Sequence, residues 1–138
     1  MAVFEGGCLC GAVRYRAEAE PIFSGTCHCS DCQRGTGSAF SCVVAVPAPV
    51  LSVTGALTRH THTGGSGKGV TILFCPVCGS RLLSEAEAMA GITMIEAGTL
   101  DNARDFVPQA HIFRDSAQHW FPFVEGMVSF PRMPPMGD

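Results

Sequence analysis

The chain carries little charge for its length. Charged residues make up 15% of its 138 residues, compared with roughly 25% in a typical soluble domain. Lys and Arg together number 9 and the formal net charge is −3, so the chain has no positive field that would attract a polyanion. We therefore expect no nucleic-acid partner. The low charge also predicts a large core, or an apolar surface that is covered by a second copy of the chain or lies in a pocket. Of these we favour a homodimer.

Long hydrophobic runs are missing as well. A membrane-spanning helix needs about 20 apolar residues, whereas the most apolar stretch, 42–51, is interrupted by Pro47 and Pro49. Residues 1–7 have neither the basic head nor the apolar segment of a signal peptide. We therefore expect no membrane association and a cytoplasmic location, where thiols stay reduced. Under these conditions the eight cysteines indicate metal binding rather than disulfides.

Three of the cysteines lie within six residues, in the segment Cys27-His28-Cys29-Ser30-Asp31-Cys32. Structural zinc normally takes four protein ligands, whereas catalytic zinc takes three and leaves one position for water or substrate. Cys27, Cys29 and Cys32 therefore predict a zinc site that is open at its fourth position. The alternative is a site closed by another side chain, and the candidates are His28, Asp31, His60, His62 and His111.

A second pair of motifs predicts a structural zinc site. Cys75-Pro76-Val77-Cys78-Gly79 has the form of a zinc knuckle, with a proline that stiffens the turn and a glycine that permits a left-handed backbone. Cys8 and Cys10 are the remaining cysteine pair, and residues i and i+2 of an extended strand point to the same side. A site made by these four cysteines would join two segments far apart in the sequence, where a cross-link restricts the unfolded chain strongly.

The rest of the chain indicates a mainly β domain with little helix. Alternating or β-branched stretches bounded by Gly and Pro predict strands. These stretches are 11–17, 38–46, 50–54, 57–63, 70–74, 81–84, 92–100 and 109–113. Cys42, inside one of them, is interpreted as a packed thiol, and 64–69 as a hairpin connection rather than a phosphate loop, because neither Ser nor Thr follows Lys68. We expect one domain over 1–138, with 120–123 capping the core and a Met/Pro-rich tail at 127–138.

The motifs together resemble a known family. They occur in family order at 7–11, 27–32, 37–40, 74–80, 97–101 and 111–113. Over about residues 5–120 the chain is similar to the glutathione-dependent formaldehyde-activating enzymes, a family that includes centromere protein V. The resemblance implies a β-tent fold of coiled antiparallel sheets with two zinc ions per chain. It assigns Cys8, Cys10, Cys75 and Cys78 to structural zinc, and Cys27, Cys29 and Cys32 to catalytic zinc.

The resemblance also implies an activity. The family's reaction adds the thiol of glutathione to formaldehyde and gives S-(hydroxymethyl)glutathione, which is a carbon–sulfur lyase reaction run in reverse. His28, Asp31 and Ser38 are candidates for proton transfer, and His111 is equally well explained as a core histidine. The alternative hypothesis is a non-enzymatic zinc-stabilised β module that binds a protein partner. A methionine sulfoxide reductase is excluded, because it needs a late cysteine and none follows Cys78.

Overall fold

The computed structural model describes residues 1–134, so the end of the predicted tail, 135–138, lies outside the described residues. The described part contains eleven strands, one α-helix and five short 3₁₀ turns. The strands are β1 (Val3–Gly7), β2 (Arg14–Glu18), β3 (Phe23–Cys27), β4 (Ser41–Pro47), β5 (Leu51–Thr54), β6 (Thr58–Thr63), β7 (Gly69–Phe74), β8 (Arg81–Ala86), β9 (Ile92–Glu96), β10 (Ala110–Ile112) and β11 (Val128–Ser129). The helix is α1 (Ser30–Thr36). The predicted mainly β class is confirmed. The prediction that the chain forms one domain stays a prediction.

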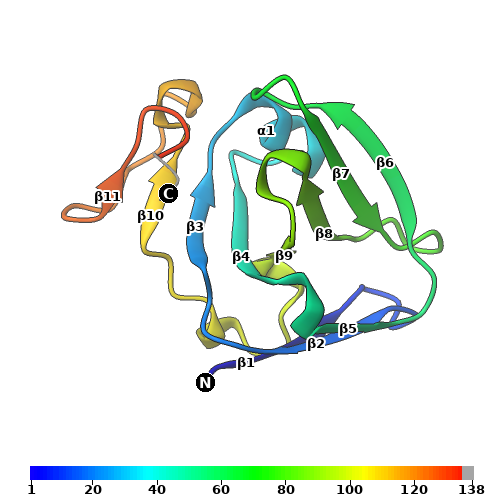
Figure 1. The fold of residues 1–138 in the computed structure, drawn as a ribbon. Helices are drawn as coiled ribbons and strands as arrows, with labels where there is room; N and C mark the ends of the chain where they lie inside the picture. The colour runs from blue at the N-terminus through cyan, green and yellow to red at the C-terminus, as the bar shows by residue number, and fades with distance from the viewer. Residues whose placement is uncertain (135–138) are drawn as a thin grey trace.

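The strands form two sheets. The larger sheet has eight strands in the order β11-β10-β3-β4-β9-β8-β7-β6, and the smaller has the order β1-β2-β5. The small sheet lies across one end of the large one (Figure 1). Strand pairs are antiparallel except at one edge, where β10 runs parallel to β3 and to β11. The prediction of antiparallel sheets is wrong at this edge, because the long connection after β9 brings the chain into β10 in the direction of β3.

The core lies between the sheets, and the sequence pattern explains why. In β2, Tyr15 and Ala17 are buried while Arg14 and Arg16 are exposed, the alternation of a strand with one solvated face. In β4, by contrast, four consecutive residues from Val43 to Val46 are buried, as in a central strand covered on both faces. Cys42 is partly buried and packs against this core, which confirms its interpretation as a packed thiol.

Two local predictions are corrected. Strand β2 begins at Arg14 rather than at Gly11, because 8–11 form a turn in which the Gly11 amide donates to the Cys8 carbonyl at 3.1 Å. Gly11 has φ +82° there, a conformation that favours glycine. Helix α1 was not expected at all. It has no buried residue, so its sequence shows none of the apolar periodicity that marks an amphipathic helix.

The segment after β10 covers part of the large sheet. Phe121 and Phe123 pack against the rings of His28 and His111, with centroid distances between 4.8 and 5.9 Å. Their predicted role in capping the core is therefore confirmed, whereas Trp120 is 61% exposed. The described part of the tail pairs with β10 through β11.

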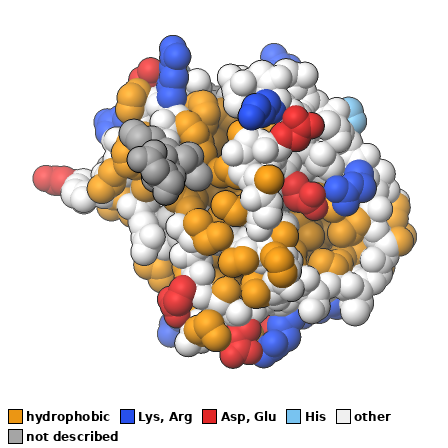
Figure 2. Space-filling model, in the orientation of Figure 1, with side chains coloured by type: hydrophobic (Ala, Val, Ile, Leu, Met, Phe, Trp, Pro, Cys, Tyr) orange, Lys and Arg blue, Asp and Glu red, His pale blue; other side chains and the backbone are white. Residues whose placement is uncertain are grey.

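Apolar side chains also reach the surface. Figure 2 shows hydrophobic side chains across the middle of one face, with charged groups mainly toward its margins. This agrees with the low charge of the sequence, but the expected homodimer stays a prediction. No helix in residues 1–134 is long and apolar enough to cross a membrane.

Candidate metal centres and active site

Four cysteines from two distant turns meet in one cluster. The Sγ atoms of Cys8, Cys10, Cys75 and Cys78 all lie within 4.8 Å of one another. The Cys8–Cys10 and Cys10–Cys75 sulfur distances are 3.6 and 3.8 Å. Four sulfurs at about 2.3 Å from a tetrahedral zinc ion would be about 3.8 Å apart. The cluster therefore fits one zinc ion.

Local backbone geometry holds these sulfurs in place. The Cys8 sulfur accepts a hydrogen bond from the Val13 amide at 3.2 Å, and the Cys75 sulfur accepts from the Val77 and Cys78 amides at 3.4 and 3.5 Å. Ser80 links the two turns, because its Oγ accepts from the Leu9 amide and lies 3.1 Å from the Cys78 sulfur. Such amides favour thiolates, the form that binds metal. Cys8 and Cys10 converge through a turn and not through the extended strand that we expected.

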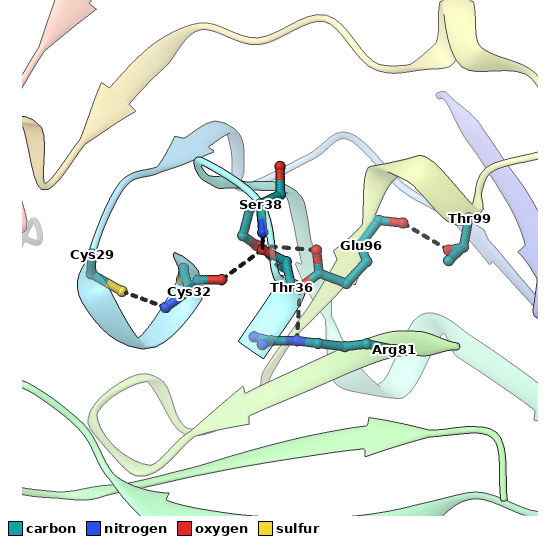
Figure 3. A network of polar contacts seen from close by, with 8 residues as sticks. Cys29, Cys32, Thr36, Ser38, Arg81, Glu96 and Thr99 are labelled. Atoms are coloured by element: carbon teal, nitrogen blue, oxygen red, sulfur yellow. Dashed lines mark hydrogen bonds and ion pairs between the residues drawn. The ribbon is translucent and has the colours of Figure 1, made fainter. Parts of the chain in front are cut away.

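The remaining cluster consists of three cysteines. The Sγ atoms of Cys27, Cys29 and Cys32 lie within 4.8 Å of one another. Cys27 is the last residue of β3, Cys29 is the N-cap of α1, and Cys32 lies in the first turn of that helix. The Cys29 sulfur accepts a hydrogen bond from the Cys32 amide at 3.2 Å, as seen in Figure 3. Cys27 is buried, whereas Cys29 and Cys32 are partly exposed, so the cluster opens toward solvent.

Within residues 1–134, no histidine, carboxylate or further cysteine joins this cluster. The strand register explains why His111, a candidate fourth ligand, is not part of the cluster. His111 is aligned with Thr26, one residue before Cys27, and successive side chains of a strand point to opposite faces. His111 therefore lies on the other face of the sheet from Cys27, where its Nδ1 is 2.5 Å from Thr26 Oγ1.

The other candidate ligands also have different surroundings. His28 is fully buried, and its Nε2 lies 3.0 Å from Thr26 Oγ1. Burial, with a smaller effect of His111, lowers the pKa of His28 to about 4, so this ring is neutral at physiological pH. His62 reaches helix α1 from the edge strand β6, and its Nε2 lies 3.7 Å from Asp31 Oδ2. His60 stacks on His62.

The pKa values of the three thiols in the second cluster shift in opposite directions. Contacts with the Cys27 and Cys32 thiols lower the pKa of Cys29. The contact with Cys29 raises the pKa of Cys27, and contacts with Cys27 and then Cys29 raise that of Cys32. Like charges this close oppose one another, so all three sulfurs ionise together only beside a cation. The donor set thus fits zinc, which favours thiolate ligands.

Sequence reasoning missed a buried ion pair beside this cluster. Arg81 Nε lies 3.1 Å from Glu96 Oε1, and the two side chains are only 15% and 10% exposed. Ser41 Oγ lies 3.1 Å from both carboxylate oxygens of Glu96. Burial raises the pKa of Glu96, although Arg81 and Ser41 act in the opposite direction. Arg81 begins β8 and Glu96 ends β9, which stops short of the predicted strand 92–100 because Ala97–Thr99 form a 3₁₀ turn. Only the sheet brings the two side chains together.

The chain matches a known protein family. The family model described as glutathione-dependent formaldehyde-activating enzyme matches residues 3–116. The chain belongs to this family. The resemblance inferred from the sequence motifs is therefore confirmed. The matched residues contain both cysteine clusters.

A solved structure agrees with the fold. A crystal structure of a Rhodobacter sphaeroides protein, a Northeast Structural Genomics target, is similar with a TM-score of 0.58 and 25% sequence identity. The similarity covers 73% of this family member and 93% of the other chain. None of the curated proteins matches this chain.

Proposed function

We propose that this protein adds the thiol of glutathione, or of a related small thiol, to formaldehyde or a similar small aldehyde. In this proposal Cys27, Cys29 and Cys32 hold a catalytic zinc ion, and Cys8, Cys10, Cys75 and Cys78 hold a structural one. The observation that carries the proposal is the difference between the clusters. One supplies the four sulfurs of a closed tetrahedral site, and the other supplies three, with no fourth histidine, carboxylate or cysteine among residues 1–134.

The chemistry needs a thiolate close to a carbonyl carbon. Zinc bound by three cysteines would supply an open position that holds a substrate thiol as its thiolate, the nucleophilic form. The new bond joins the thiol sulfur to the aldehyde carbon while the carbon–oxygen π bond breaks, and the proton lost by the thiol ends on the oxygen. Atoms and charge balance without an oxidant or reductant.

The described residues support this reaction by binding and orientation. Cys29 fixes the start of α1, because its sulfur accepts from the Cys32 amide at 3.2 Å. Two cysteines of the cluster are therefore held by one turn of helix. Asp31, exposed in the same turn, lies 3.7 Å from His62, which places a carboxylate and an imidazole beside the cluster's helix.

Exchange NMR tests the proposal. Glutathione and carbon-13-labelled formaldehyde form the adduct slowly without a catalyst, and the exchange rate between hydrate and adduct is measured with and without zinc-loaded protein. We expect the protein to accelerate exchange and Cys29→Ser to remove the acceleration. Lys68→Ala, an exposed change in the β6–β7 hairpin, is the control and should retain it. Equal exchange with wild type, Cys29→Ser and buffer would refute the enzyme and favour a zinc-stabilised binding module.

A further inference from the structure

A cavity of about 370 Å³ lies beside the helix that carries Cys32. Its wall includes three glycines, each from a different part of the fold: Gly35 of α1, Gly79 after the second zinc knuckle cysteine, and Gly98 after β9. Its polar lining includes Ser41, Arg81 and Glu96. The cavity therefore has backbone walls and a buried pair of opposite charges.

The strand register places this cavity on the same side of the sheet as the three-cysteine cluster. Cys27 pairs directly with Ser41, and Val43 pairs with Glu96. Directly opposed residues share a face, as do residues two apart on one strand. The side chains of Cys27, Ser41 and Glu96 consequently lie on one face.

The separation between the cluster and the cavity is short. The Cα atoms of paired residues such as Cys27 and Ser41 are about 5 Å apart, and Ser41 Oγ is 3.1 Å from the Glu96 carboxylate. Together these two distances are about the length of one or two residues of extended chain. A thiol held at the cluster can therefore place an attached group in the cavity.

The guanidinium of this ion pair has one buried nitrogen without a hydrogen bond. Arg81 Nε is near Glu96 but has no hydrogen-bond partner within the described residues. Figure 3 shows the guanidinium below Thr36 of α1 and facing Glu96. A side chain at position 35 would collide with Arg81 Nη1, so the glycine leaves the room that the guanidinium occupies. A buried ion pair is seldom the most stable filling of a core, and this one lines a cavity.

We propose that this cavity binds the α-amino-acid head group of the thiol substrate, which in glutathione is the γ-glutamyl end. The head group's carboxylate binds the guanidinium of Arg81, and its ammonium binds the carboxylate of Glu96. A zwitterion matches a paired cation and anion, whereas a simple anion would be repelled by Glu96. This inference rests on the proposed function, because it takes the substrate thiol to be held at Cys27, Cys29 and Cys32.

The test compares two thiols that differ only in the head group. Glutathione and N-acetylcysteinylglycine share the thiol and the glycyl carboxylate, but the second lacks the zwitterion. Their dissociation constants are measured by calorimetry on zinc-loaded protein. From the usual strength of hydrogen bonds to charged groups, we expect wild-type protein to bind glutathione at least about tenfold more tightly than N-acetylcysteinylglycine. Equal affinities for the two thiols, or no binding of either, would overturn the proposal.

Substitutions locate the effect. Glu96→Gln keeps the shape of the side chain and removes its charge, so the preference for glutathione should disappear. Glu85→Gln is the matched control, because Glu85 lies on β8 and pairs with an arginine, Arg59, at the surface. It should keep the full preference, and loss of the preference in this control would place the head group elsewhere. If Glu96→Gln does not fold, the comparison of the two thiols on wild-type protein still decides whether the head group binds. The amide chemical shifts of Gly79 and Gly98, which line the cavity, should change when glutathione is added and not when N-acetylcysteinylglycine is added.

The binding test and the exchange test can fail separately. A preference for glutathione without accelerated exchange would retain the head-group site and reject the catalytic proposal. Accelerated exchange with equal affinities for the two thiols would retain the catalytic proposal and reject the head-group site.

Discussion

Replacing Cys78 with serine should destabilise the whole fold, whereas replacing Cys29 should not. Cys78 belongs to the cluster that joins the turn after β1 to the turn after β7, and the sulfurs of Cys10 and Cys75 in that cluster are 3.8 Å apart although 65 residues separate them. Cys29 belongs to the cluster in which all three cysteines are close in sequence, so a metal ion bound there would close no long loop.

The size of the effect follows from loop closure. If bound zinc restricts the unfolded chain as a cross-link over 65 residues does, the free energy of unfolding includes about 4 kcal/mol from this source. That is a large fraction of the roughly 5–15 kcal/mol by which domains are stable. Cys29→Ser loses no such cross-link, and serine remains a favourable N-cap for α1.

Urea unfolding of zinc-loaded protein, followed by circular dichroism, measures the difference. With a slope of about 2 kcal/mol per molar urea, the Cys78→Ser midpoint should fall by about 2 M, while that of Cys29→Ser should stay close to wild type. Equal midpoints for the two variants would refute the assignment of one cluster to the fold and the other to chemistry.

Two further predictions are independent of this one. Zinc analysis should give two ions per wild-type chain and one for Cys29→Ser, and one ion in fully loaded wild type would contradict the two-site proposal. Burial raises the pKa of Tyr15 from 10.0 to about 12, although a hydrogen bond with Thr99 opposes the shift. Because folding favours the neutral phenol, its stabilising contribution is complete below pH 10 and is lost as the pH rises to 12. Tyr15 is the only tyrosine, so absorbance at 295 nm follows it directly, and a midpoint near 10 in folded protein would contradict its burial.

Much of the cysteine clustering could be predicted from local spacing. Two or three cysteines within a few residues need little long-range information to bring their sulfurs together, and the pairing of Cys8 and Cys10 with Cys75 and Cys78 follows by elimination. Eight of the eleven strands in the described residues were predictable, because alternation and β-branched runs are local signals, whereas β1, β3 and β11 were not predicted. The helix was missed because it buries nothing, and the parallel edge was missed because strand direction depends on a distant connection.

The sequence by itself therefore determined which thiols cluster, since short-range geometry sets the three-cysteine cluster and each pair of the other cluster, and elimination joins the two pairs. Only the tertiary structure decided which groups share a face with the cluster. The register of β3 with β4 and β10 puts His111 on the opposite face from Cys27 and puts Ser41 and Glu96 on the same face. Register is a property of paired strands rather than of one segment, and a shift of one residue would exchange the two faces. For that reason the ion pair of Arg81 and Glu96 and the cavity it lines have no local sequence signal.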